Sequence, residues 1–92
     1  MTTLEKAIET YGKDMQLTVA VEEFSELIKE ICKNKRGADN RDAIIEELAD
    51  CFIMAEQLQI IFEIADTDIM AKMGEKLERL EKRLEERSEN DS

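Results

Sequence analysis

Apolar residues recur along this chain every three or four positions, which is the spacing of helices that bury one face. Four segments carry the pattern, at residues 3–11, 15–35, 41–65 and 67–87. No segment alternates between apolar and polar residues as a strand would, and no internal repeat or linker interrupts the chain. The pattern therefore predicts an all-α fold in one domain, residues 1–88, with a frayed tail at residues 89–92.

The residues between these segments are typical of helix ends. Gly12 is expected to end the first helix, and Asp14 to cap the second. The run 37–40, Gly-Ala-Asp-Asn, interrupts the pattern and offers a cap to the third helix. Asp66-Thr67-Asp68 supplies the cap of the fourth. These breaks predict a bundle of four helices joined by short turns.

The third predicted helix is apolar around nearly its whole circumference. The residues concerned are Ile44, Ile45, Leu48, Phe52, Ile53, Met54, Leu58, Ile60, Ile61, Phe62 and Ile64. A helix that is apolar on every side is stable only if it is buried on every side. Three other helices from a 92-residue chain cannot cover it. We therefore expect a homo-oligomer, a dimer or a tetramer, to complete the bundle.

The composition excludes several classes of function. The chain has 23 acidic and 13 basic residues, a formal charge of −10, and no histidine. The absence of histidine excludes Ser-His-Asp nucleophiles and histidine-based zinc sites. The negative charge argues against nucleic acid and anionic membranes as partners. Without a signal sequence or a membrane-length apolar run, the chain is expected to be cytoplasmic. Cys32 and Cys51 match no metal or redox spacing and are expected to be buried.

Acidic residues gather in two groups on the second and third predicted helices. The groups are Glu22, Glu23, Glu26 and Glu30, and Glu46, Glu47 and Asp50. Such groups usually form a solvated helix face. Glu47 and Asp50, however, continue the apolar stripe of Met54 and Leu58 instead of facing away from it. A buried carboxylate must be protonated, ion-paired or metal-bound. A hard cation with oxygen ligands, Mg²⁺ or Mn²⁺, suits such a group and points to phosphoryl chemistry.

The two acidic groups also carry a family resemblance. Glu22-Glu23-Phe24-Ser25-Glu26, followed by Glu47-Leu48-Ala49-Asp50, resembles the EExxE…ExxD signature of the MazG-like, all-α nucleoside triphosphate pyrophosphohydrolases. The apolar residues that flank both motifs are similar too. The likeness covers roughly residues 4–80. It implies a four-helix MazG-like bundle completed by oligomerisation.

The resemblance also implies an activity. Members of this family use Mg²⁺, with Mn²⁺ as a possible substitute, to hydrolyse a nucleoside triphosphate to the monophosphate and pyrophosphate, by attack of water at the α-phosphorus. Carried over by motif, the metal ligands are Glu23, Glu26, Glu47 and Asp50, and the residues that orient or activate the water are Glu22 and Glu26; Glu30 is another candidate for the water. The phosphate-binding residues are Lys72, Lys76 and Arg79. The role implied is house-cleaning of aberrant or excess nucleotides.

Two other functions remain open from the sequence. One is a non-catalytic acidic oligomer that engages a partner through the narrow seam of Leu77, Leu80 and Leu84. The other is a regulator that binds nucleotide and magnesium without turnover. Lys76 and Arg79 equally suit exposed pairing with neighbouring glutamates.

Overall fold

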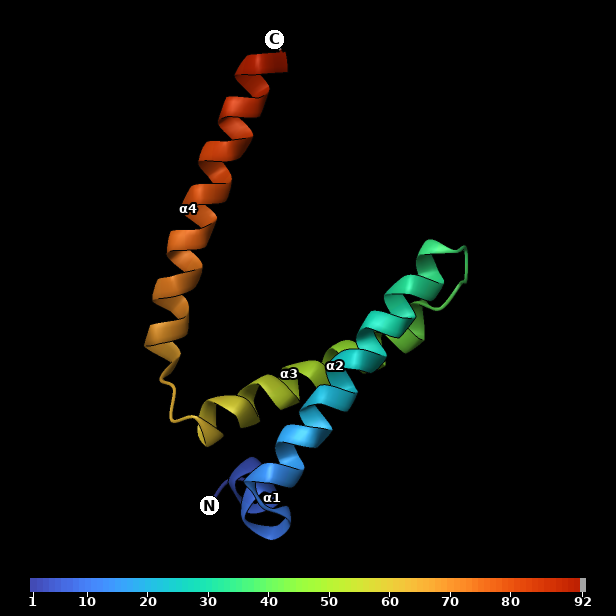
Figure 1. Ribbon diagram of the computed structural model, residues 1–92, viewed down its shortest axis with the longest axis vertical. Coiled ribbons are helices and arrows are strands. Elements are labelled where there is room, and N and C mark those ends of the chain that lie inside the picture. Colours follow the sequence, from blue (N-terminus) through green and yellow to red (C-terminus); the bar gives the residue numbers. More distant parts are fainter. Residues whose placement is uncertain (92) are drawn as a thin grey trace.

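A computed structural model describes residues 1–91, and Ser92, the end of the predicted tail, lies outside the described residues. It contains four helices: α1, Thr3–Tyr11; α2, Lys13–Lys35; α3, Arg41–Ile61; and α4, Asp66–Asp91 (Figure 1). No strand occurs in residues 1–91. The prediction of an all-α fold is confirmed.

The ends of α1 and α2 follow from local hydrogen bonds. Thr2 caps α1: its hydroxyl accepts from the Glu5 backbone N–H, and its own N–H donates to the Glu5 carboxylate. Gly12, at φ 92°, ends α1 and also precedes the first residue of α2. Asp14 therefore lies in the first turn of α2, where its charge favours the helix dipole, and the prediction that it caps this helix is wrong.

The third helix ends at Ile61, four residues before the predicted end at Ala65. Glu63 takes a left-handed conformation with φ 54°, and the Ile64 N–H donates to the Gln59 carbonyl at 2.8 Å. This bond reaches back five residues, as in the Schellman ending of a helix. Glycine usually takes the left-handed position, so the sequence carried no signal for this stop. Helix α4 runs to Asp91, beyond the predicted end at Arg87.

The helices α2 and α3 form an antiparallel hairpin, and α1 packs beside its open end (Figure 1). Few apolar side chains are buried; they are Ile8, Ala20, Cys51, Met54 and Ile61. Burial of Cys51 is as predicted, but Cys32 is exposed, because it lies on a side of α2 that α3 does not cover. The outer face of the strongly apolar α3 is also exposed, including Phe52 and Ile53.

The fourth helix stands apart from the hairpin. After the turn at residues 62–65, α4 diverges from α3, so that the hairpin and α4 form the arms of an open V (Figure 1). The radius of gyration is 17.5 Å, against about 12 Å for a compact domain of this length. Within one chain, the helices of residues 1–91 therefore do not close into a bundle.

Among residues 1–91, no helix combines the length and the apolar character that crossing a membrane requires.

Candidate metal centre

Three carboxylates meet where the middle of α2 faces the middle of α3. Glu23 comes from α2, and Glu47 and Asp50 come from α3. One oxygen from each lies within 4.8 Å of the other two. Glu47 and Asp50 share a helix face because they are three residues apart, whereas Glu23 joins them only through the antiparallel pairing of the two helices. The cluster is therefore a product of the hairpin.

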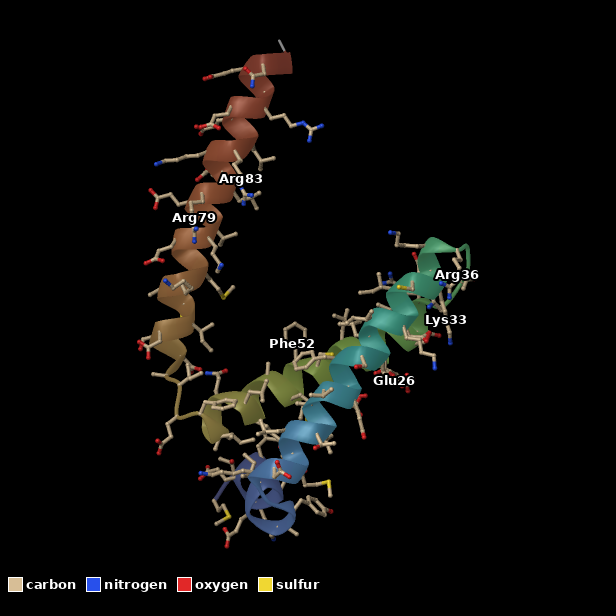
Figure 2. The ribbon with its side chains drawn as sticks, viewed as in Figure 1. Glu26, Lys33, Arg36, Phe52, Arg79 and Arg83 are labelled. Carbon is tan, nitrogen blue, oxygen red and sulfur yellow. The ribbon has the colours of Figure 1, made fainter. Side chains whose placement is uncertain are left out.

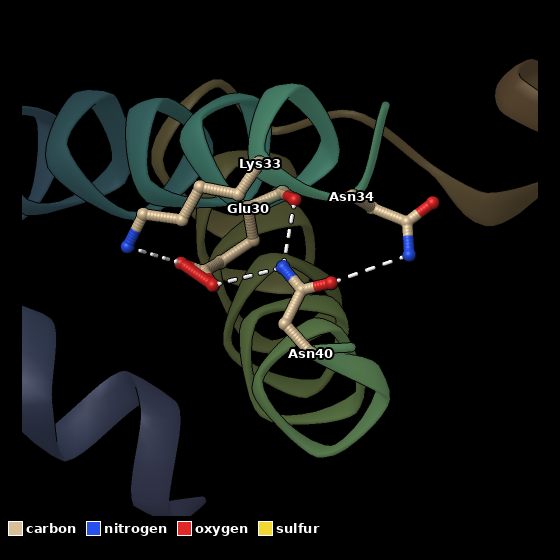
Figure 3. A network of polar contacts seen from close by, with 4 residues as sticks. All are labelled: Glu30, Lys33, Asn34 and Asn40. Atoms are coloured by element: carbon tan, nitrogen blue, oxygen red, sulfur yellow. Dashed lines mark hydrogen bonds and ion pairs between the residues drawn. The ribbon is translucent and has the colours of Figure 1, made fainter. Parts of the chain in front are cut away.

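Two polar contacts fix the register of this hairpin on either side of the cluster. Towards α1, the side-chain amide of Gln16 donates to that of Gln57 at 2.7 Å, and both residues are buried. Towards the turn, the Asn40 amide donates to the backbone carbonyl of Glu30 at 2.9 Å and to its carboxylate at 3.1 Å (Figure 3). The pairs bracket Glu23 and Asp50 along the interface, so they hold the two carboxylates opposite each other.

The electrostatics of the cluster disfavour its negative charge. Burial raises the pKa of Glu23, and interaction with the neighbouring carboxylates, Asp50 above all, raises it further. Burial likewise raises the pKa of Glu47, together with the charges of Asp50 and other nearby acids. The main causes of both shifts all raise the pKa, and among the described residues no basic side chain forms an ion pair with Glu23 or Glu47. Glu47 Oε2 is buried and has no hydrogen-bond partner in the described part of the chain.

A bound cation would offset the mutual repulsion of these carboxylates. Carboxylates that converge without a basic partner must share protons or bind a positive ion. Mg²⁺ and Mn²⁺ prefer oxygen ligands, and oxygens of one octahedral shell about Mg²⁺ lie about 3–4 Å apart. The 4.8 Å spread of the three oxygens is slightly wider, within reach of small side-chain rotations. The donor set of Glu23, Glu47 and Asp50 therefore fits such an ion.

The other predicted acidic residues lie around this trio. Glu26 is exposed on α2 but close enough that its charge contributes to the raised pKa of both Glu23 and Glu47. It is outside the three-oxygen group, although the resemblance made it a ligand. Glu22 is exposed on α2. Glu30, another predicted candidate for the water, is instead held by Asn40 and by an ion pair with Lys33 at 3.3 Å (Figure 3).

The predicted phosphate-binding residues lie on the separate arm. Lys72, Lys76 and Arg79 belong to α4, and none of them is among the charges that act on Glu23 or Glu47. Lys72 pairs with Glu75 at 2.9 Å on the same helix. Lys76 and Arg79 border a shallow hollow of about 570 Å³ that also includes Arg83; Figure 2 labels Arg79 and Arg83 on this arm. One chain therefore does not bring these cations to the carboxylates.

Cys51 is a neighbour of the cluster that sequence reasoning did not place there. Its thiol contacts the backbone carbonyl of Glu23 at 3.5 Å. Burial raises the pKa of this thiol, and the charges of Glu47, Glu23 and Asp50 raise it further. The sequence feature that could have placed Cys51 beside the cluster is its position directly after Asp50 in an apolar stretch of α3. The Cys51 thiol, with its pKa raised, is thus packed against the carboxylate site.

The chain was compared with protein-family models, curated proteins and solved structures, and none of them matches.

Proposed function

We propose that this protein is a Mg²⁺-dependent nucleoside triphosphate pyrophosphohydrolase, which cleaves a (deoxy)nucleoside triphosphate to the monophosphate and pyrophosphate. One observation carries the proposal. Glu23, Glu47 and Asp50, which come from two motifs twenty residues apart, present oxygens within 4.8 Å of one another. These are three of the four ligands that the MazG-like signature implies. The approach of Glu23 to Glu47 and Asp50 supports the proposal beyond the signature, since motif letters do not determine how two helices pair.

The acidic side chains have separate roles in the proposed reaction. Glu23, Glu47 and Asp50 hold the metal, whose charge, when it is bound, neutralises the triphosphate and favours attack of water at the α-phosphorus. The buried Oε2 of Glu47, which has no hydrogen-bond partner among the described residues, is available to the ion as a ligand. To Glu26 and Glu22, exposed on the same helix as Glu23, we assign the orientation of the attacking water.

The wider biological setting is part of the same proposal. The enzyme works as a homo-oligomer, in keeping with the apolar residues exposed on one chain, and removes aberrant or excess nucleotides. Phosphate contacts come from Lys76 and Arg79 on α4, with a smaller part for Lys72, which already pairs with Glu75.

Release of pyrophosphate tests the proposal directly. The purified protein is incubated with a panel of ordinary and modified nucleoside triphosphates, with Mg²⁺, with Mn²⁺ and with EDTA. We expect metal-dependent release from at least one nucleotide. Glu47→Gln should lower the rate on the order of 100-fold or more, because it removes a charged ligand. The matched control is Glu46→Gln, the same change at an exposed neighbour outside the cluster.

The outcome separates the proposal from its alternatives. If no nucleotide releases pyrophosphate in a metal-dependent way, the enzymatic proposal is wrong. Thermal stabilisation by Mg²⁺ and nucleotide without turnover would then identify a nucleotide-binding regulator. Absence of both responses would favour a non-catalytic acidic oligomer.

A further inference from the structure

The end of the hairpin that carries the turn is basic, although the chain as a whole is acidic. Residues 29–41, from the last part of α2 to the first residue of α3, contain five basic and two acidic side chains, a formal charge of +3 in a chain of −10. The basic residues are Lys29, Lys33, Lys35, Arg36 and Arg41. The carboxylate cluster lies on the same two helices, so a cationic region adjoins the candidate metal centre within one chain.

Lys33 continues the acidic stripe of α2. The stripe consists of Glu23, Glu26, Glu30 and Lys33. Its members are spaced by three, four and three residues, so at 100° per residue they fall within about 80° of one another around the helix. Lys33 follows Glu23 by ten residues, about 15 Å along the helix axis. Figure 2 shows Glu26 and Lys33 on the side of the hairpin that faces away from α4. A ligand that extends from the cluster along this side towards the turn would therefore meet Lys33.

The ammonium group of Lys33 is held at the surface by a fixed carboxylate. One oxygen of Glu30 pairs with Lys33 Nζ at 3.3 Å, and the other accepts from the Asn40 amide (Figure 3). The side chain of Glu30 is 12% exposed and that of Lys33 is 44% exposed, so the ammonium group lies between the carboxylate and the solvent. Because an ammonium group has three N–H donors, the pairing leaves donors for an anion. A side chain that is already ordered also loses less entropy on binding than a free one does.

Glu30 places Lys33 near the carboxylate cluster. Burial is the main cause of the raised pKa of Glu47, and the charge of Glu30 is among those of the nearby acids that contribute. A divalent ion compensates only part of the charge of a polyphosphate, so a second cationic group is needed farther along the phosphate chain. The basic residues of α4 lie on the other arm of the V (Figure 1). Within one chain, the turn end of the hairpin supplies this charge.

We propose that Lys33 binds the terminal phosphate of the triphosphate, so that the substrate extends from the carboxylate cluster along α2 and the part released as pyrophosphate lies nearest the turn. Glu30 and Asn40 position Lys33 and do not contact the substrate, which gives Glu30 a role other than activation of water. A diphosphate is too short to make this contact, so Lys33 selects for the number of phosphates. The inference rests on the proposed function for the identity of the substrate, but the phosphate contact is testable without turnover.

Binding of inorganic tripolyphosphate tests the contact without any activity. Calorimetry is performed on the purified chain in the presence of Mg²⁺. Lys33→Gln should weaken binding about tenfold or more, as expected for the loss of one hydrogen bond to a charged group. Lys33→Arg should retain most of the affinity, because it keeps the charge. The matched control is Lys35→Gln, the same change in the last turn of α2 but on the opposite side of the helix, and it should bind as the wild type does.

Non-cleavable nucleotides identify the phosphate that Lys33 contacts. Affinities are measured for the α,β-methylene analogues of a nucleoside triphosphate and of the diphosphate with the same base. Lys33→Gln should weaken binding of the triphosphate analogue and leave that of the diphosphate analogue nearly unchanged. If Lys33 only stabilised the fold through Glu30, the variant would melt at a lower temperature and bind both analogues equally less well, and this outcome would overturn the inference.

The same variant separates this inference from the proposed function. Metal-dependent release of pyrophosphate with a KM that Lys33→Gln does not alter would leave the enzymatic proposal standing and overturn the inference. Tripolyphosphate binding that depends on Lys33, without turnover of any nucleotide, would refute the enzymatic proposal and retain the phosphate contact.

Discussion

The side-chain amide of Gln16 donates a 2.7 Å hydrogen bond to the amide oxygen of Gln57 inside the interface between α2 and α3. Both residues are almost completely buried. An apolar pair would pack there in several registers, whereas a buried polar pair is satisfied in one. Because a shift of one residue would move Glu23 away from Asp50, this bond links the specificity of the fold to the carboxylate cluster.

Removing one member of this pair should destabilise the protein more than replacing both. Gln57→Ala leaves the buried Gln16 amide without its partner, and we expect a loss of about 1–3 kcal/mol in the free energy of unfolding. The double variant Gln16→Leu/Gln57→Leu should lose much less, since neither polar group remains. Chemical denaturation at fixed protein concentration measures both. Equal losses in the two variants would show that the pair acts only by filling space.

Asn40 should support the hairpin through its amide group. It stands at the start of α3 but makes no capping bond there: its Nδ2 donates to Glu30, and its Oδ1, the atom that would cap the helix, accepts from Asn34. This hydrogen bond, more than Lys33, holds the pKa of Glu30 below its usual value. A lowered carboxyl pKa contributes stability above the unfolded-state value of 4.5, and that stability is lost as pH falls through the folded-state pKa.

We therefore expect Asn40→Ala to lower the melting temperature at pH 7 and to reduce the loss of stability between pH 4.5 and more acid conditions. Asn34→Ala is the matched control, because Asn34 contacts Asn40 but not the Glu30 carboxylate (Figure 3). A parallel shift of the whole curve of melting temperature against pH would mean that Asn40 does not act through Glu30.

Local features of the fold were predictable from helical spacing, whereas the meeting of Glu23 with Glu47 and Asp50 was implied only by the family resemblance. The i, i+3 pair of Glu47 and Asp50 and its place on an apolar stripe follow from helical spacing alone. That Glu23 meets them required the register of the hairpin, which Gln16 and Gln57 help to fix although no motif distinguishes them. Apolar periodicity describes one helix at a time and does not indicate which helices pair or in which register.

The same limit explains what sequence reasoning got wrong or left out. The end of α3 was misplaced because a glutamate, Glu63, takes the left-handed position that glycine usually signals. Burial of Cys32 was inferred from its apolar neighbours, but which side of α2 meets α3 depends on tertiary packing. The divergence of α4 from α3 could not be predicted. An apolar stripe indicates that a helix packs against something, but it does not identify the surface that covers it.

Replacing Glu47 with glutamine should stabilise the metal-free protein. Burial and neighbouring acids raise the Glu47 pKa above 4.5, so the folded state binds this proton more tightly than the unfolded state. Stability therefore falls as pH rises from 4.5 through the raised value, and the full loss persists at pH 7. Glutamine carries no charge and escapes this loss. We expect a higher melting temperature than wild type in EDTA at pH 7, with the difference shrinking towards pH 4.

The same variant tests the metal site without measuring activity. Mg²⁺ should raise the melting temperature of the wild-type protein and of Glu46→Gln, but not that of Glu47→Gln. The assignment of Glu47 as a ligand is refuted if the glutamine variant gains as much stability from Mg²⁺ as the wild type does.

Cys51 should resist thiol reagents in the native protein. The thiolate is the reactive form, and burial, with the charges of the carboxylate cluster, raises the pKa of this thiol. In a Cys32→Ser background, N-ethylmaleimide should label Cys51 only after denaturation, as followed by mass spectrometry. Labelling of the native protein at the rate of a free peptide thiol would contradict the packing of Cys51 against Glu23.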